Sequence, residues 1–179
     1  MRRSAFWLEQ GWTAYQDAKG QWTIPLTLRP SSLQHHGGQI CLPGGRVEPD
    51  ESILEAALRE FEEELGIRPD VTHCCGELSP QYVYGSDNLV HPLVMLIQPP
   101  TQPWKPDPME VEKVIPLHLS VLLDQSSRTE LVKQRTVRKA DREVGRLKFR
   151  APAIEHDEHQ IWGATALILD QLARILQRS

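Results

Sequence analysis

Long hydrophobic runs are absent from this chain of 179 residues. The longest apolar stretch, residues 90–97, is interrupted by His91 and Pro92 and is far shorter than the ~20 residues that a membrane-spanning helix requires. The first residues, Met1 to Glu9, include two arginines but lack the apolar run of ~7–15 residues that characterises a secretory signal peptide. These absences predict no membrane association and a cytoplasmic location.

Cysteine is also scarce, and it occurs only as Cys41, Cys74 and Cys75. An odd number with two adjacent members suits a reducing compartment, so we expect small packing residues rather than a disulfide or a metal site. The composition, 40% hydrophobic and 25% charged, excludes a disordered or collagen-like chain. The length fits one domain at ~100–200 residues per domain, so a single domain over residues 1–179 is expected.

The net charge of −4 conceals two clusters of opposite sign. Residues 50–64 contain seven acidic residues and one basic residue, Arg59, whereas residues 128–150 contain nine basic and three acidic residues. An acidic cluster can hold a divalent cation and a basic segment can receive phosphate, although a solvated surface explains the basic segment equally well. The negative net charge and the lack of a nucleic-acid-reading motif argue against a nucleic-acid partner.

Apolar spacing and chain breakers predict strands mixed with a few helices. Strands are expected at residues 12–15, 22–28, 72–76, 82–84, 90–98, 110–117 and 144–149, and helices at 51–65, 119–124 and 164–177. A short apolar stretch at residues 40–42 precedes a Pro-Gly-Gly breaker, and the proline-rich residues 99–108 are expected to form a loop. One strong central helix and one C-terminal helix among strands indicate a sheet covered on both faces.

The helix expected at residues 51–65 carries its acidic residues in an unfavourable arrangement. Glu60, Glu63 and Glu64 share one face, where like charges repel, and the helix dipole near Gly66 disfavours each anion by a further ~0.3–1 kcal/mol. Local penalties without a local gain indicate a functional site, and hard Mg²⁺ or Mn²⁺ would offset the charge because it prefers carboxylate oxygen. Arg59 can pair with Glu63 four residues on and hold its carboxylate. The apolar stripe of this helix is expected to comprise Leu54, Ala57, Leu58, Phe61 and Leu65.

The spacing of these glutamates resembles the Nudix box. Gly45, five residues, Glu51, seven residues and then Arg59 to Ile67 fit that motif without a gap. Seven identities at fixed spacing have a chance probability on the order of 10⁻⁸ per start position. Phe61 stands where an aliphatic residue is usual and still meets the apolar requirement.

The resemblance implies an α/β/α sandwich with a mixed β-sheet between helices, and hydrolysis of a diphosphate joined to a further group. It implies that Glu60 and Glu64 bind the metal ion with help from Glu63, which is either a ligand or the general base. A further acid from residues 107–112 is a candidate for completing the site. The expected catalytic set, including residues that orient the ligands or bring backbone against the ion, is Glu51, Glu60, Glu63, Glu64, Arg59 and Gly45.

Residues 26–45 resemble a second signature, that of the coenzyme A pyrophosphatase branch of Nudix hydrolases, and residues 161–166 resemble the start of the closing helix of that branch. Departures from the signature are Pro30, Gln34 and Leu42, where the branch usually has Ser or Ala, Arg and Phe. The signature matches at Thr27, Arg29, Gly38, Pro43, Gly44 and Gly45, with softer matches at His36 and Gln39.

The branch resemblance implies hydrolysis of CoA or acyl-CoA to 3′,5′-ADP and (acyl-)4′-phosphopantetheine. Arg29, His36, Gln39 and Arg46 are the expected substrate-binding residues, although histidines beside glycines are more often turn residues. The alternatives are a Nudix enzyme for another nucleoside diphosphate derivative, such as an ADP-sugar, NADH or an oxidised nucleotide, and a non-catalytic Nudix-fold binding module. The complete set of box carboxylates argues against the module. The sequence favours neither a monomer nor a homodimer.

Overall fold

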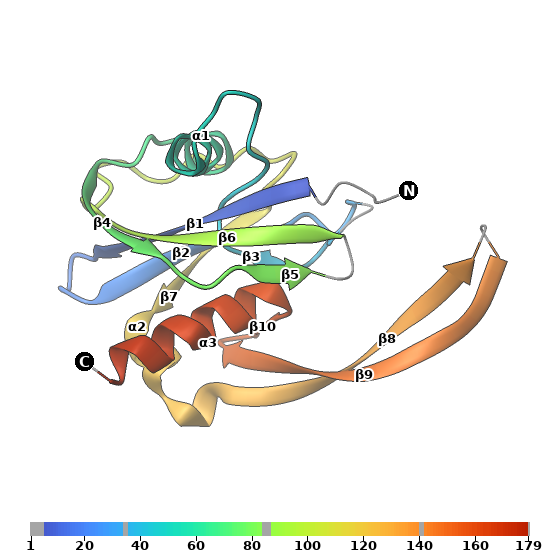
Figure 1. Ribbon diagram of the computed structural model, residues 1–179. Helices are drawn as coiled ribbons and strands as arrows, with labels where there is room; N and C mark the ends of the chain where they lie inside the picture. The colour runs from blue at the N-terminus through green and yellow to red at the C-terminus, as the bar shows by residue number, and fades with distance from the viewer. Residues whose placement is uncertain (1–5, 34–35, 84–86, 140–141, 179) are drawn as a thin grey trace.

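A mixed seven-stranded sheet forms the centre of the computed structural model, which describes residues 6–33, 36–83, 87–139 and 142–178 (Figure 1). Its strands are β1 (Phe6–Gln16), β2 (Trp22–Leu28), β3 (Ile40–Cys41), β4 (Val71–Glu77), β5 (Gln81–Val83), β6 (Asn88–Ile97) and β7 (Lys113–His118). The order is β3-β2-β1-β6-β4, with β5 paired to β6 and β7 paired to β2. Strand β1 runs parallel to β6 and antiparallel to β2, so the sheet is mixed, as expected.

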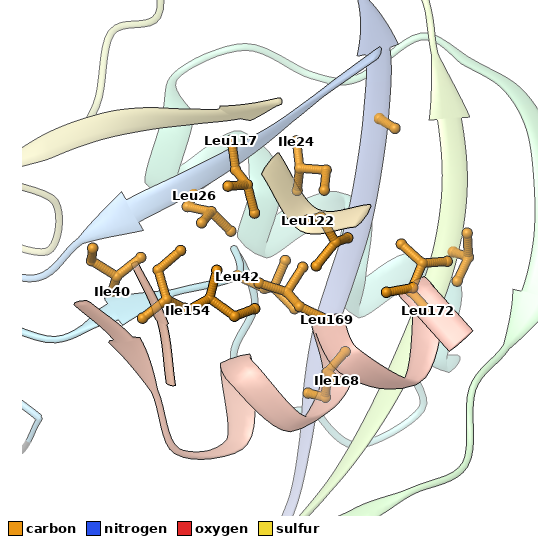
Figure 2. Packing of buried hydrophobic residues seen from close by; sticks show 14 of the residues in the cluster. Ile24, Leu26, Ile40, Leu42, Leu117, Leu122, Ile154, Ile168, Leu169 and Leu172 are labelled. Carbon is orange, nitrogen blue, oxygen red and sulfur yellow. The ribbon is translucent and has the colours of Figure 1, made fainter. Parts of the chain in front are cut away.

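Two helices cover opposite faces of this sheet (Figure 1). Helix α1 (Ile53–Leu65) packs on β1 and β6 through small apolar clusters that include Ala57, Phe61 and Leu65. On the other face, α3 (Ala164–Leu176) and the short α2 (Leu119–Leu123) enclose the largest core cluster, in which Leu42, Leu122 and Leu169 meet (Figure 2). The expected α/β/α sandwich is confirmed.

Capping interactions set the bounds of α1. Ser52 is the N-cap: its Oγ accepts from the Glu55 backbone N–H at 3.3 Å, and the Ser52 N–H donates to Glu55 Oε2 at 2.9 Å. This reciprocal pair, a capping box, starts the helix at Ile53 rather than at the predicted Glu51. Gly66 ends the helix in the left-handed region with φ of 71°, as its position in the sequence predicts.

The buried face of α1 differs from the predicted stripe. Leu54 is 38% exposed, whereas Ala56 and the carboxylate-bearing Glu64 are buried together with Ala57, Phe61 and Leu65. The helix is therefore rotated so that one acidic side chain enters the protein. Apolar spacing alone could not predict this rotation, because it assigns every glutamate to the solvent side.

A second sheet of three antiparallel strands extends the fold beyond the sandwich. It consists of β8 (Arg128–Lys139), β9 (Arg142–His156) and β10 (His159–Trp162), and a turn of 3₁₀ helix at Gln125–Ser127 precedes it. The β8–β9 hairpin projects away from the rest of the molecule (Figure 1). The sequence predicts only residues 144–149 of this sheet as a strand; β8, the inner part of β9 and β10 are missed because charged residues, a proline and short apolar runs give them no clear strand pattern.

The prediction that Cys74 and Cys75 are core residues is wrong. Both are exposed on β4, which lies at the end of the strand order, while α1 packs mainly on β1 and β6.

The other predicted strands are present with shifted ends, and Tyr84 lies outside the described residues. Among the described residues, no helix combines the length and apolar character needed to cross a bilayer.

We expect Gly66→Ala to destabilise the protein more than Gly20→Ala. Both glycines have positive φ, 71° and 75°, so both substitutions strain the backbone by about 1 kcal/mol. At Gly66 an added Cβ would also lie 2.2 Å from the Lys105 carbonyl oxygen, whereas at Gly20 it meets no atom within 4 Å. Urea denaturation should show a further loss of at least ~1 kcal/mol for Gly66→Ala. Equal losses would contradict the close approach to Lys105.

Candidate active site

Two carboxylates of α1 meet the glycine loop that follows β3. The Gly44 N–H donates to Glu64 Oε2 at 3.3 Å, and the Arg46 N–H donates to Glu60 Oε1 at 3.2 Å. A Cβ at Gly45 would lie 2.1 Å from the Glu60 carboxyl carbon, so a larger residue would push this carboxylate away. The breaker residues predicted from sequence therefore bring backbone directly against Glu60 and Glu64.

Burial sets the electrostatics of this pair. The Glu64 side chain is 4% exposed, and burial raises its pKa to about 8, although the Gly44 N–H and the Arg29 guanidinium act in the opposite direction. Burial also raises the pKa of Glu60, against the lowering effect of Arg59. Ionising both carboxylates together is costly, and a divalent cation would neutralise both charges. Both side chains would bind a metal ion through oxygen, which is the ligand atom that hard cations prefer.

Arg59 organises the acidic side chains around it. Its Nε and Nη2 donate to the two oxygens of Glu51 at 2.9 and 3.0 Å, and its Nη1 donates to Glu60 Oε1 at 3.0 Å. Its Nη2 also donates to the Arg46 carbonyl at 2.9 Å. The forked contact lowers the pKa of Glu51 and keeps it ionised. These contacts place Glu51 and Arg59 where they can orient Glu60.

Glu63 lies apart from the buried pair. The predicted Arg59–Glu63 ion pair is present at 3.1 Å, and it keeps the Glu63 carboxylate at the surface, 60% exposed. Among the described residues, no group of three His, Cys, Asp or Glu side chains converges closely enough to hold a metal ion. The structure thus brings Glu60 and Glu64 together and leaves Glu63 beside them, in contact with Arg59.

Arg29 joins the site from the end of β2. Its Nη1 lies 3.9 Å from Glu64 Oε1, and within the described part of the chain its Nε–H is buried without a hydrogen-bond partner. The backbone is fixed by two hydrogen bonds, from the Arg29 N–H to the Gln39 carbonyl and from the Gly38 N–H to the Arg29 carbonyl, both 3.0 Å. Arg29 therefore offers unused donor capacity beside the buried carboxylate.

These features agree with comparisons to known proteins. A family model described as NUDIX domain matches residues 13–140. The chain belongs to the Nudix hydrolase family. It is 36% identical over 156 residues to "Uncharacterized Nudix hydrolase NudL" of Photorhabdus laumondii, covering 87% of this chain and 78% of that protein. It is 30% identical over 162 residues to "Mitochondrial coenzyme A diphosphatase NUDT8" of Mus musculus, covering 88% of this chain and 72% of that protein.

Solved structures support the same fold at lower identity. The MutT protein from Methanosarcina mazei Go1 gives a TM-score of 0.53 at 23% identity, over 68% of this chain and 83% of that one. The NUDIX domain of Shewanella oneidensis NrtR, solved with ADP-ribose, gives 0.52 at 17% identity, over 68% and 77% of the two chains. Nudix hydrolases generally use divalent metal ions, which agrees with the donor chemistry of Glu60 and Glu64.

The remaining signature residues of this Nudix hydrolase lie in the turn before β3, on the loop after it or in the core. His36 has a positive φ of 59° and hydrogen-bonds Gln39 through Nδ1 and Oε1 at 3.0 Å, so both are turn residues whose contact with substrate remains a prediction. The Arg46 side chain is exposed, and its backbone contacts Glu60 and Arg59. Leu42 is buried in the core rather than at the site, and Gln34 lies outside the described residues.

The loop before β7 supplies an acid that the spacing did not identify. The Asp107 N–H donates to the Glu64 carbonyl at 3.3 Å, and the Glu112 N–H donates to the Leu28 carbonyl at 2.8 Å, so this loop is held between α1 and β2. Among its acids, Glu110 is the one whose charge contributes to the raised pKa of Glu64. No local sequence signal distinguishes Glu110, because its place depends on contacts across the fold.

We expect Glu64→Gln to stabilise the metal-free protein at alkaline pH. A folded-state pKa of about 8, above the ordinary value, means that the protonated carboxyl is favoured and that stability falls as the pH rises from about 5 through 8. Gln avoids this loss, so chemical denaturation in EDTA at pH 8.5 should show a gain of roughly 2–4 kcal/mol that disappears near pH 4.5. Glu63→Gln, at an exposed position, is the control and should not stabilise the protein at pH 8.5, because it removes the ion pair with Arg59.

Proposed function

We propose that this Nudix hydrolase splits the diphosphate of CoA or acyl-CoA into 3′,5′-ADP and (acyl-)4′-phosphopantetheine, with Mg²⁺ or Mn²⁺. The observation that carries the proposal is the approach of Arg29 to Glu64, 3.9 Å between Nη1 and Oε1. Arg29 belongs to the CoA-branch signature and Glu64 to the Nudix box, so the two motifs meet at one point. The similarity to a mouse protein named as a coenzyme A diphosphatase supports the same substrate.

The substrate needs cations beyond the metal ion. CoA carries a diphosphate and a ribose 3′-phosphate, and an arginine fork matches phosphate oxygens well. The buried Nε–H of Arg29, which has no hydrogen-bond partner among the described residues, is a donor that a phosphate oxygen would satisfy. Arg46, whose backbone N–H donates to Glu60, is a second, exposed cation next to the site in the sequence.

In the proposed reaction, different side chains bind the metal ion, orient its ligands and accept the proton of the attacking water. Glu60 and Glu64 would hold the divalent cation, and Arg59 keeps Glu60 oriented. The ion, when bound, would offset negative charge on the phosphoryl oxygens and lower the pKa of water. The oxygen of one water molecule bonds to a phosphorus, the bridging P–O bond breaks, and the bridging oxygen leaves with the other phosphate. Glu63 and Glu110 are the candidates for accepting the water proton.

The proposal is tested by product analysis after incubation with CoA, an acyl-CoA, ADP-ribose, NADH and a deoxynucleoside triphosphate, each with Mg²⁺ or Mn²⁺. We expect 3′,5′-ADP from the CoA species and a loss of at least ~10³-fold in kcat for Glu64→Gln, because that variant removes a metal-binding carboxylate. Turnover of another substrate in place of CoA would contradict the assignment of CoA or acyl-CoA as the substrate. No metal-dependent turnover of any of them would contradict hydrolysis and favour a binding module.

Arg29→Lys should lower kcat/KM for CoA by about 10²-fold. Lysine keeps the charge but loses the planar fork and the Nε–H donor, so phosphate is bound through fewer directed hydrogen bonds. Arg68→Lys is the matched control, because Arg68 is 68% exposed and pairs only with Glu62 among the ion pairs of the described residues. Steady-state kinetics that show equal effects of the two substitutions would remove Arg29 from the site.

A further inference from the structure

We propose that the β8–β9 hairpin, residues 128–150, is an arm through which two copies of this chain associate. The arm is long: nine consecutive residues of β9, Arg142 to Arg150, are exposed. At ~3.3 Å per residue this run covers about 30 Å, the diameter of a small domain. An arm of this length can reach across a second molecule.

The root of the arm is fixed to the body, so the arm has a defined direction. Arg128 forms an ion pair with Asp170 of α3, and the Lys133 ammonium lies 4.5 Å from the centre of the Trp162 ring. Beyond residue 150, β9 enters the core through Ala151, Ala153 and Ile154. These contacts hold one end of the ribbon and leave the other projecting from the molecule (Figure 1).

The projecting part has apolar side chains that the described residues leave uncovered. Leu147 and Phe149 alternate on β9, and Phe149 lies opposite Lys133, so the two side chains share one face of the ribbon. Arg146, Lys148 and Arg150 occupy the other face, which also carries Val132 opposite Arg150. A two-stranded ribbon is at best marginally stable in water and needs a covering surface. The exposed apolar residues are Val132 (71%), Val144 (58%), Leu147 (56%) and Phe149 (36%).

Charge identifies the covering surface as a second copy of the chain. The arm contains nine basic and three acidic residues, a net of six positive charges, which leaves eleven basic and twenty-one acidic residues, a net of ten negative charges, elsewhere. Arm against arm would bring like charges together, whereas arm against the body of a second copy pairs opposite charges. Stacked sheets lie ~10 Å apart, about one Debye length at 0.1 M salt, so attraction between the basic arm and an acidic surface strengthens at low salt and weakens at high salt.

A polyanion such as nucleic acid fits the observations less well. It would match the basic face but would not cover Leu147 and Phe149, and the negative body would repel it. A second copy supplies exposed apolar side chains outside the arm, such as Leu54 and Leu176, as well as negative charge. If each copy lays its arm on the other, the two contacts are related by a twofold axis and the assembly closes as a dimer.

Sedimentation velocity over a range of protein concentrations tests the proposal. We expect a concentration-dependent dimer whose dissociation constant rises at least tenfold between 50 and 500 mM salt, because opposite charges are screened. Leu147→Ser and Lys148→Glu should each raise the dissociation constant at least tenfold. The matched controls, Leu147→Met at the same arm position and Lys19→Glu in the β1–β2 turn, keep the apolar side chain or change a charge outside the arm, and should leave it unchanged. Circular dichroism and thermal melting confirm that each variant is folded.

Zero-length carbodiimide cross-linking of mixed light and isotope-labelled protein identifies the contact. Mixed light–heavy peptides that join an arm lysine to an acidic residue outside 128–150 support the arm-on-body dimer. Arm-to-arm cross-links, or a dissociation constant that falls with salt, would overturn it. A monomer at all concentrations would also overturn it, and retention of that monomer on heparin through Lys148 would assign the arm to a polyanion. None of these readouts depends on turnover, so they stand apart from the proposed hydrolysis.

Discussion

Glu64 carries its carboxylate on the face of α1 that packs toward the sheet, where burial raises its pKa to about 8. This placement accounts for several neighbouring features. It rotates α1 so that Leu54 faces solvent, and it requires a polar contact from the loop, which the Gly44 N–H supplies. It also draws Arg29 from the end of β2, so that the motifs before and within α1 contact one another. A buried group that is costly to ionise often marks a functional site, and in the proposed function this carboxylate would bind a cation.

The parts of the site that the sequence predicts correctly depend on short-range interactions. Spacing within one helix places Arg59 beside Glu63, and the Ser52 and Gly66 caps follow from local chemistry. The errors come from interactions that cross the fold. Whether Glu63 or Glu64 turns inward depends on the loop at Gly44, and Glu110 approaches Glu64 only because its loop is held between α1 and β2. No spacing within the chain encodes these choices.

The same distinction applies to the strands. Strands β2 and β6 are readily predicted because both are buried and apolar, whereas β8 is charged, touches little core and is stabilised mainly by pairing with β9. Cys74 and Cys75 were misassigned for a related reason. Small apolar residues in a strand indicate a core position only if the strand is covered, and β4 lies at the end of the order. Position within a sheet is a long-range property that composition does not reveal.

The parallel pairing of β1 with β6 has a consequence for how the chain is made. Phe6 lies opposite Asn88 and Ala14 opposite Leu96. The ribosome must therefore synthesise about half of the chain before β6 is available to pair with β1. At ~5–20 residues per second, β1 leaves the ribosome several seconds before β6. Among the described residues, its pairing with β2 is confined to Tyr15 and Gln16. Until β6 has been made, most of β1 therefore has no strand to pair with, and its backbone N–H and C=O groups stay open to pairing with another chain.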